Sequence, residues 1–148
     1  MQTLLMLIWF VALFPGYFQT QAISLAEFSA LTNENKQGKQ GLLQDAFTNH
    51  KSNIQVKGQG IVVKILADDF DGSRHQRFIV KLSSGQTLLI AHNIDLAPRI
   101  NALQLGDSIL FFGEYEWNPQ GGVIHWTHRD RHGDHVAGWI EHQGKKYQ

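Results

Sequence analysis

The chain has 148 residues, 43% of them hydrophobic, and is long enough for one domain with a sizeable core. Lysine plus arginine and aspartate plus glutamate number 13 each, which gives a formal net charge of zero. This balance argues against binding to nucleic acid by overall charge and leaves only a local basic stripe for that purpose. The chain has no cysteine, which excludes disulfides, thiol nucleophiles and cysteine-ligated zinc.

The first 22 residues predict an export signal. Residues 4–18 are almost all apolar, and no charged side chain precedes Glu27. The stretch has the length of a signal-peptide core and is shorter than a membrane span of about 20 residues. We therefore predict cleavage after Ala22 and a periplasmic or secreted protein without further membrane contact. Because the segment begins without lysine or arginine, an uncleaved N-terminal anchor is the alternative.

Residues 23–53 are predicted to form a linker and a short helix. The segment 33–41 is polar and contains glycine, which is typical of a linker or turn. Leu42, Leu43, Ala46 and Phe47 then recur at helical spacing, which predicts a short amphipathic helix over residues 41–50.

A β pattern begins near residue 54 and continues to the C-terminus. Ile61, Val63 and Ile65 would share one face of a strand, and Val62, Lys64 and Leu66 the other. Because both faces are mainly apolar, the pattern predicts a first strand buried on both faces. Further strands are predicted at 75–82, 87–92, 108–117 and 123–128, a short helix at 95–106 and a last hairpin at 139–147. Five strands with a helix between the third and fourth follow the order of an OB-fold barrel. We predict a mostly β protein with a single OB-like barrel over residues 54–148.

Five phrases of the sequence resemble a bacterial family of small exported proteins that carry a domain of unknown function. They are RHQRF (74–78), LLIAHNIDLAPRI (88–100), GEYEWN (113–118), GGVIHWTH (121–128) and GWIEHQGKKYQ (138–148). The resemblance extends from about residue 55 to the C-terminus. It implies an exported OB-like domain and implies no particular reaction.

Five of the eight histidines lie between His125 and His142, and imidazole is the side chain that titrates near neutral pH and binds metals most readily. His128, His132 and His135 share one loop with two aspartates, which predicts a possible metal site there; a solvated polar loop is the alternative. If the fifth strand is regular, Trp126 faces inward with Ile124, and His125 lies on the opposite face. Phe112 and Trp139 are predicted to belong to the core.

A second group of residues predicts the binding of an anionic ligand. His75 and Arg77 share one face of the second strand, and OB barrels commonly use the exposed face of strands two and three. Arginine holds phosphate or carboxylate through two parallel hydrogen bonds. Cross-strand pairing of these residues with Glu114 or Glu116 is the alternative. The predicted ligand is a nucleotide, another small anion or nucleic acid, and the sequence does not indicate a protein partner. The predicted binding residues are Arg74, His75, Arg77, Arg99, Trp117, His125 and His128.

An enzyme is the rival hypothesis. The chain resembles staphylococcal-nuclease-like barrels in placing acids after its first and third strands, and Asp69, Asp71 and Asp95 could hold a divalent metal ion. A metal-dependent phosphodiesterase of this kind would use His125 or His92 as base together with Arg77. The arginine and glutamate that flank the corresponding acid in that family are missing around Asp95 and Pro98. A structural envelope module without catalysis is the third hypothesis.

Overall fold

A computed structural model describes residues 24–130 and 132–148, so the predicted export signal lies outside the described residues. In this described part of the chain the elements follow one another as a single helix and then seven strands. They are α1 (Leu25–Thr48), β1 (Ile54–Ile65), β2 (His75–Lys81), β3 (Thr87–Asn93), β4 (Ser108–Glu116), β5 (Val123–His125), β6 (Trp139–His142) and β7 (Lys145–Tyr147).

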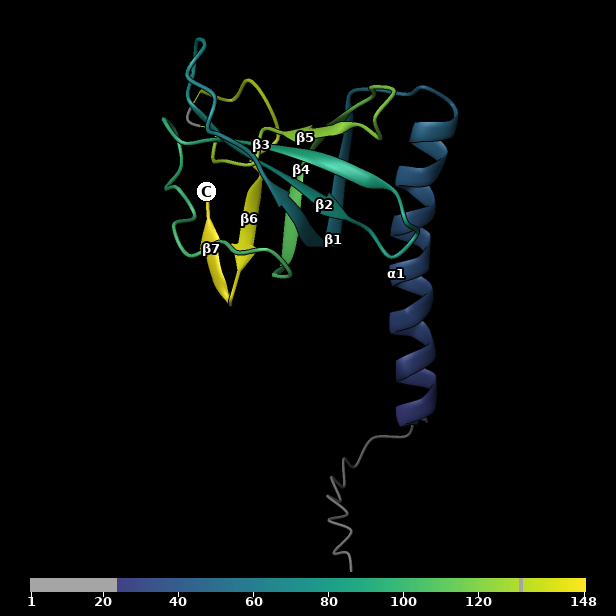
Figure 1. Cartoon of the computed structure of the whole chain (residues 1–148). Coiled ribbons are helices and arrows are strands. Elements are labelled where there is room, and N and C mark those ends of the chain that lie inside the picture. The colour runs from purple at the N-terminus through teal and green to yellow at the C-terminus, as the bar shows by residue number, and fades with distance from the viewer. Residues whose placement is uncertain (1–23, 131) are drawn as a thin grey trace, which may run out of the picture.

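The first five strands close into a barrel, as predicted (Figure 1). The strand order is β1-β2-β3-β5-β4, and β4 returns to pair with β1. β3 and β5 pair in parallel, whereas the other barrel strands pair antiparallel. This closure confirms a mostly β fold with one OB-like barrel. The β6–β7 hairpin adds to the barrel from outside, because β6 pairs with the first half of β4 and leaves the second half to β5.

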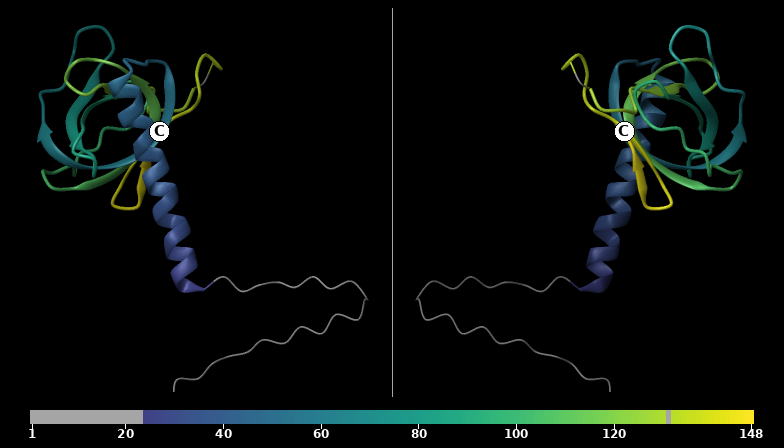
Figure 2. Two further views of the ribbon diagram at one scale, coloured as in Figure 1. Left: turned by 90° about the vertical axis from the view of Figure 1, so that its right-hand side faces the viewer. Right: turned by 90° about the vertical axis from the view of Figure 1, so that its left-hand side faces the viewer.

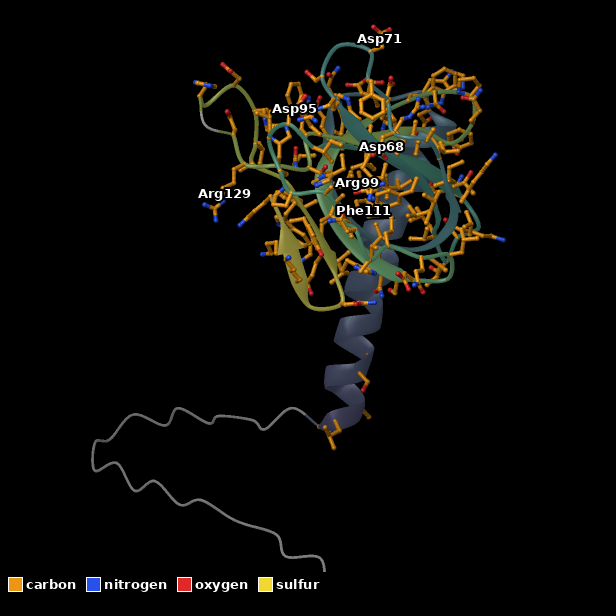
Figure 3. All side chains as sticks on the ribbon, turned by 60° about the vertical axis from the view of Figure 1, so that its left-hand side comes forward. Asp68, Asp71, Asp95, Arg99, Phe111 and Arg129 are labelled. Atoms are coloured by element: carbon orange, nitrogen blue, oxygen red, sulfur yellow. The ribbon has the colours of Figure 1, made fainter. Side chains whose placement is uncertain are left out.

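The core fills the barrel with alternate residues of each strand. Phe78, Ile90 and Ile124 are completely buried, and each is flanked along its strand by half-exposed side chains. Phe111 points into the barrel interior (Figure 3) and lies against Gly58 of β1, where an added Cβ would stand only 2.3 Å from the ring. The outward positions of the same strands are therefore the ones that can carry a site.

Helix α1 is longer than predicted. It includes residues 33–41, where the sequence predicts a linker, because lysine and glutamine favour a helix and each of the two glycines in this segment costs only about 1 kcal/mol. Its last turns dock on the barrel through buried Leu43 and Ala46, and the Trp117 indole N–H donates to the carbonyl of Phe47. The earlier turns extend beyond the barrel (Figures 1 and 2). Among the described residues, no helix has the length and apolar character needed to cross a membrane.

Two local predictions for the barrel are wrong. The connection between β3 and β4 consists of turns instead of a short helix, because side chains take the backbone groups that a helix would use. The Gln76 amide, for example, both donates to and accepts from the backbone of Ile100. β1 is not buried on both faces either, since Ile61 and Val63 are each 44% exposed around a bulge in its pairing with β2.

Candidate metal centre

A row of polar side chains crosses the outer face of three barrel strands. Glu114 and Glu116 are two residues apart on β4 and therefore share its outward face. His125 of β5 pairs with Glu114 on one side, and Gln55 of β1 pairs with it on the other. Strand alternation and register thus bring together residues that are up to 70 positions apart in the sequence.

Glu114, Glu116 and His125 converge closely enough to share one ion. A ligand atom from each lies within 4.8 Å of the other two, and all three residues are half-buried. His125 Nε2 lies 3.5 Å from Glu114 Oε1. The backbone N–H of Asn53 donates to Glu116 Oε1 at 3.3 Å, which holds that carboxylate in place.

Two buried nitrogens in this row have no hydrogen-bond partner among the residues that the structure describes. They are Nε2 of His125 and Nε2 of Gln55. Leaving such an atom unpaired away from water costs about 1–3 kcal/mol, so an unpaired buried nitrogen beside carboxylates calls for an explanation. Two ligand atoms that are each about 2.1 Å from one ion lie about 3.4 Å apart at a tetrahedral angle. The 3.5 Å separation of His125 and Glu114 fits this spacing, so a divalent cation would satisfy both groups.

The electrostatics of His125 favour a neutral ring. Burial lowers the pKa of His125 below its ordinary value of 6.5, and the carboxylates of Glu114 and Glu116 oppose this shift only in part. A neutral imidazole has a lone pair to offer to a metal. The ring is therefore in its metal-binding protonation state at neutral pH.

From the sequence, His125 is predicted as a ligand-binding residue and a candidate base, but none of His125, Glu114 and Glu116 is predicted as a metal ligand. Glu114 and Glu116 are predicted there as possible ion-pair partners of residues on β2. Their i, i+2 spacing on a predicted strand does indicate a shared face, but only the register of β4 against β5 places His125 beside them.

The chain changes direction directly after His125. Trp126 has a φ of 51°, which is rare for a bulky side chain, and β5 ends one residue earlier. The prediction that Trp126 faces inward is therefore wrong, since it is 38% exposed, whereas Thr127 and His128 are buried. The Trp126 ring packs against the rings of His125, His128 and His135, with the nearest ring centres 4.3 Å apart.

His92, one of the predicted bases, lies inside the barrel and is fully buried. Its Nε2–H donates to the carbonyl of Pro98 at 3.2 Å, and its Nδ1 accepts the Thr127 hydroxyl at 2.8 Å. Burial is the main reason that the pKa of His92 is lowered to about 4. Both ring nitrogens thus have protein partners, and the ring is neutral at pH 7.

The three predicted binding arginines each pair with an aspartate. Arg74 lies 2.6 Å from Asp95, Arg77 lies 3.3 Å from Asp69, and Arg99 grips both oxygens of Asp68. These acids include two of the predicted nuclease-type metal ligands. The third, Asp71, is exposed at the tip of the β1–β2 loop, and Asp68, Asp95 and Arg99 lie below it at the same end of the barrel (Figure 3). Within each pair the carboxylate balances the positive charge of the guanidinium group.

The remaining predicted residues are spread over the surface. His75 begins β2, and Trp117 docks the helix, with the His50 ring 4.2 Å away. His132 is exposed, and its backbone N–H donates to Asp130. Phe112 and Trp139, predicted as core, lie half-buried on the outer face of β4 and β6 instead, and the ammonium groups of Lys57 and Lys146 lie over the Trp139 ring.

A family model described as "Protein of unknown function (DUF3465)" matches residues 24–148, which include both the helix and the barrel. No curated protein matches the sequence. The match confirms the resemblance to a family with a domain of unknown function and extends it to the N-terminal helix. Because the match covers more than half of the chain, the protein belongs to the DUF3465 family.

Proposed function

We propose that this OB-like protein binds a divalent transition-metal ion through Glu114, Glu116 and His125. The observation that carries the proposal is the unpaired, buried Nε2 of His125 beside the Glu114 carboxylate. One imidazole and two carboxylates suit zinc or manganese better than magnesium or calcium, which prefer oxygen ligands alone. Of the metal sites considered from the sequence, the aspartates near the β1–β2 loop gain no support, because arginines already pair with Asp69 and Asp95.

Three protein ligands leave at least one coordination position open, and this position supports the binding of an anion. Metal sites with an open fourth position bind water or an oxygen ligand there. Gln55 of β1 is the direct cross-strand neighbour of Glu114 of β4. Its Nε2 is the second buried nitrogen without a partner among the described residues, and it can donate to such a ligand. We therefore propose that a small oxyanion binds through the metal, because Arg74, Arg77 and Arg99 are engaged by aspartates.

Zinc titration of the metal-free protein against a fluorescent chelator tests the metal site. We expect one site for which Glu114→Gln and His125→Gln each lower the zinc affinity by about 30-fold, or roughly 2 kcal/mol. Glu141→Gln is the matched control, because Glu141 faces outward on β6 and is not part of the group. Affinity should fall as the pH drops through the lowered pKa of His125, where protons compete for its ring.

Equal zinc affinity in the wild type, Glu114→Gln and His125→Gln would refute the metal site. Inorganic phosphate is then added to the zinc-loaded wild type and to a Gln55→Leu variant. We expect phosphate to raise the melting temperature of the wild type more than that of the variant. If phosphate leaves the melting temperature of the zinc-loaded wild type unchanged, the anion part of the proposal fails and the metal part stands on its own titration.

We also propose that the protein acts outside the cytoplasm. The apolar segment 4–18 supports this proposal, and the family match begins at residue 24, two residues after the predicted cleavage site at Ala22. Expression of the full chain in a bacterium should yield a periplasmic or secreted form whose mass corresponds to a chain that begins at Ile23. Recovery of the full-length mass from the membrane fraction would support the anchor alternative instead.

A further inference from the structure

Two further imidazoles come together beside the candidate metal centre. His128 and His135 lie near the two ends of the loop 126–138, which projects from the barrel wall (Figure 2). Their ring centres are 4.8 Å apart, and the ring planes are nearly perpendicular at 84°. The Trp126 ring packs against both. The third histidine of this loop, His132, is exposed and has no ring contact with them among the described residues.

The hydrogen bonds of the two rings fix which nitrogen is free. Nδ1 of His128 lies 2.8 Å from the carbonyl oxygen of Arg129, and Nδ1 of His135 lies 2.9 Å from that of Val136. Because a carbonyl oxygen can only accept, each Nδ1 carries the proton, and each neutral ring keeps its lone pair on Nε2. A histidine that donates one N–H to a carbonyl and leaves the other nitrogen bare is the usual form of a metal ligand.

The separation of the two ring centres is one that chelation of a single ion allows. With a metal–nitrogen bond of about 2.1 Å, an ion lies about 3.2 Å from each ring centre, so two rings at right or tetrahedral angles have centres about 4.5 to 5.2 Å apart. The observed 4.8 Å falls within this interval. Among the described residues, the fully buried side-chain nitrogens without a hydrogen bond belong to Gln55 and His125, so Nε2 of His128 and of His135 is not completely enclosed, although His128 as a whole is only 2% exposed.

The loop holds both rings in place by its own hydrogen bonds. The Asp130 carboxylate accepts the backbone N–H groups of His132 and His135, each at 2.8 Å, and these bonds lower the pKa of Asp130 to about 2. The Gly138 N–H donates to the carbonyl of His128 at 2.8 Å and closes the base of the loop. The pair is thus preorganised, which reduces the entropy that a ligand must remove on binding.

We propose that His128 and His135 form a second metal site, distinct from the Glu114, Glu116 and His125 group, which binds copper(II) through the two Nε2 atoms. Imidazole nitrogen suits copper and nickel, and copper(II) forms the strongest complexes of the divalent first-row ions. The site contains no carboxylate ligand, so it prefers copper more strongly than the first site does. Water completes the coordination.

Copper(II) buffered with glycine tests the site in the full chain. We expect copper to quench the fluorescence of Trp126, and electron paramagnetic resonance to show two imidazole nitrogens on the ion. His128→Gln and His135→Gln should each lower copper affinity by about 10- to 100-fold. His132→Gln, from the same loop, is the matched control and should bind as the wild type does. Trp126→Phe should keep the resonance spectrum and lose most of the quenching.

The outcomes separate this site from the first one. If the Glu114→Gln, Glu116→Gln double variant abolishes copper binding, or if His132→Gln weakens it as much as His135→Gln does, the second site is refuted whatever the zinc titration shows. Circular dichroism checks that each variant is folded. Because His128 is buried and its replacement could unfold the loop, the half-exposed His135 decides the test.

Discussion

Acidification from pH 7 to pH 4 is expected to lower the free energy of unfolding by about 3 kcal/mol through His92 alone. The pKa of His92 is about 4 in the folded barrel, against an ordinary value of 6.5 in the unfolded chain. Above pH 6.5 the ring is neutral in both states, and the stability is complete. Between pH 6.5 and 4 only the unfolded chain takes up the proton, so stability falls as the pH falls and the contribution is lost below pH 4.

Urea denaturation at several pH values measures this effect. His92→Gln can keep a hydrogen bond to Pro98 and removes the titrating group, so its stability should change much less over the same range. The remaining change reports His125, whose pKa is also lowered. Asp95 and Asp107 are carboxylates with lowered pKa values, and their contribution to the free energy of unfolding is lost only below about pH 4. They therefore do not disturb the comparison. Parallel pH profiles for the wild type and His92→Gln would contradict the assignment.

Replacing Gly138 by alanine is expected to cost roughly 3 kcal/mol and to disorder both candidate sites. A Cβ at this position would stand 2.0 Å from the carbonyl oxygen of Trp126 and 2.5 Å from that of Phe112. Both are backbone atoms, so β4 or the segment after β5 must move. The Gly138 N–H also holds the carbonyl of His128, and its displacement would release the loop that carries His128 and His135.

Gly41→Ala provides a control of opposite sign. Gly41 lies in helix α1 with open space around its missing Cβ, so alanine should stabilise the chain by about 0.5–1 kcal/mol. Thermal unfolding of both variants measures the difference. We expect zinc and copper binding to weaken in Gly138→Ala and to remain unchanged in Gly41→Ala. A Gly138→Ala variant as stable as the wild type would show that the backbone does not approach as closely as the structure has it.

The barrel was predictable because alternation along a strand is a local property. Residues 75–82, 87–92 and 108–117 alternate clearly, and each forms a strand close to its predicted bounds. The sequence could not show that no helix forms between β3 and β4. The Gln76 amide, which bonds the backbone there in place of a helix, comes from 24 residues away. The fifth strand ends early for a similar reason, since the strained φ of Trp126 is held by packing against Gly138 and the neighbouring imidazoles.

The sequence by itself determined the β class, the five-strand order and the family resemblance, and it pointed to the histidine-rich C-terminal segment. Only the tertiary structure decided which of those histidines lie together and beside which partners. Arginine and aspartate residues that look like a binding site in sequence neutralise one another in space, whereas Glu114 and Glu116 gain His125 as a neighbour. The physical reason is that residue type and periodicity are encoded locally, whereas the register between β4 and β5 is fixed by closure of the whole barrel.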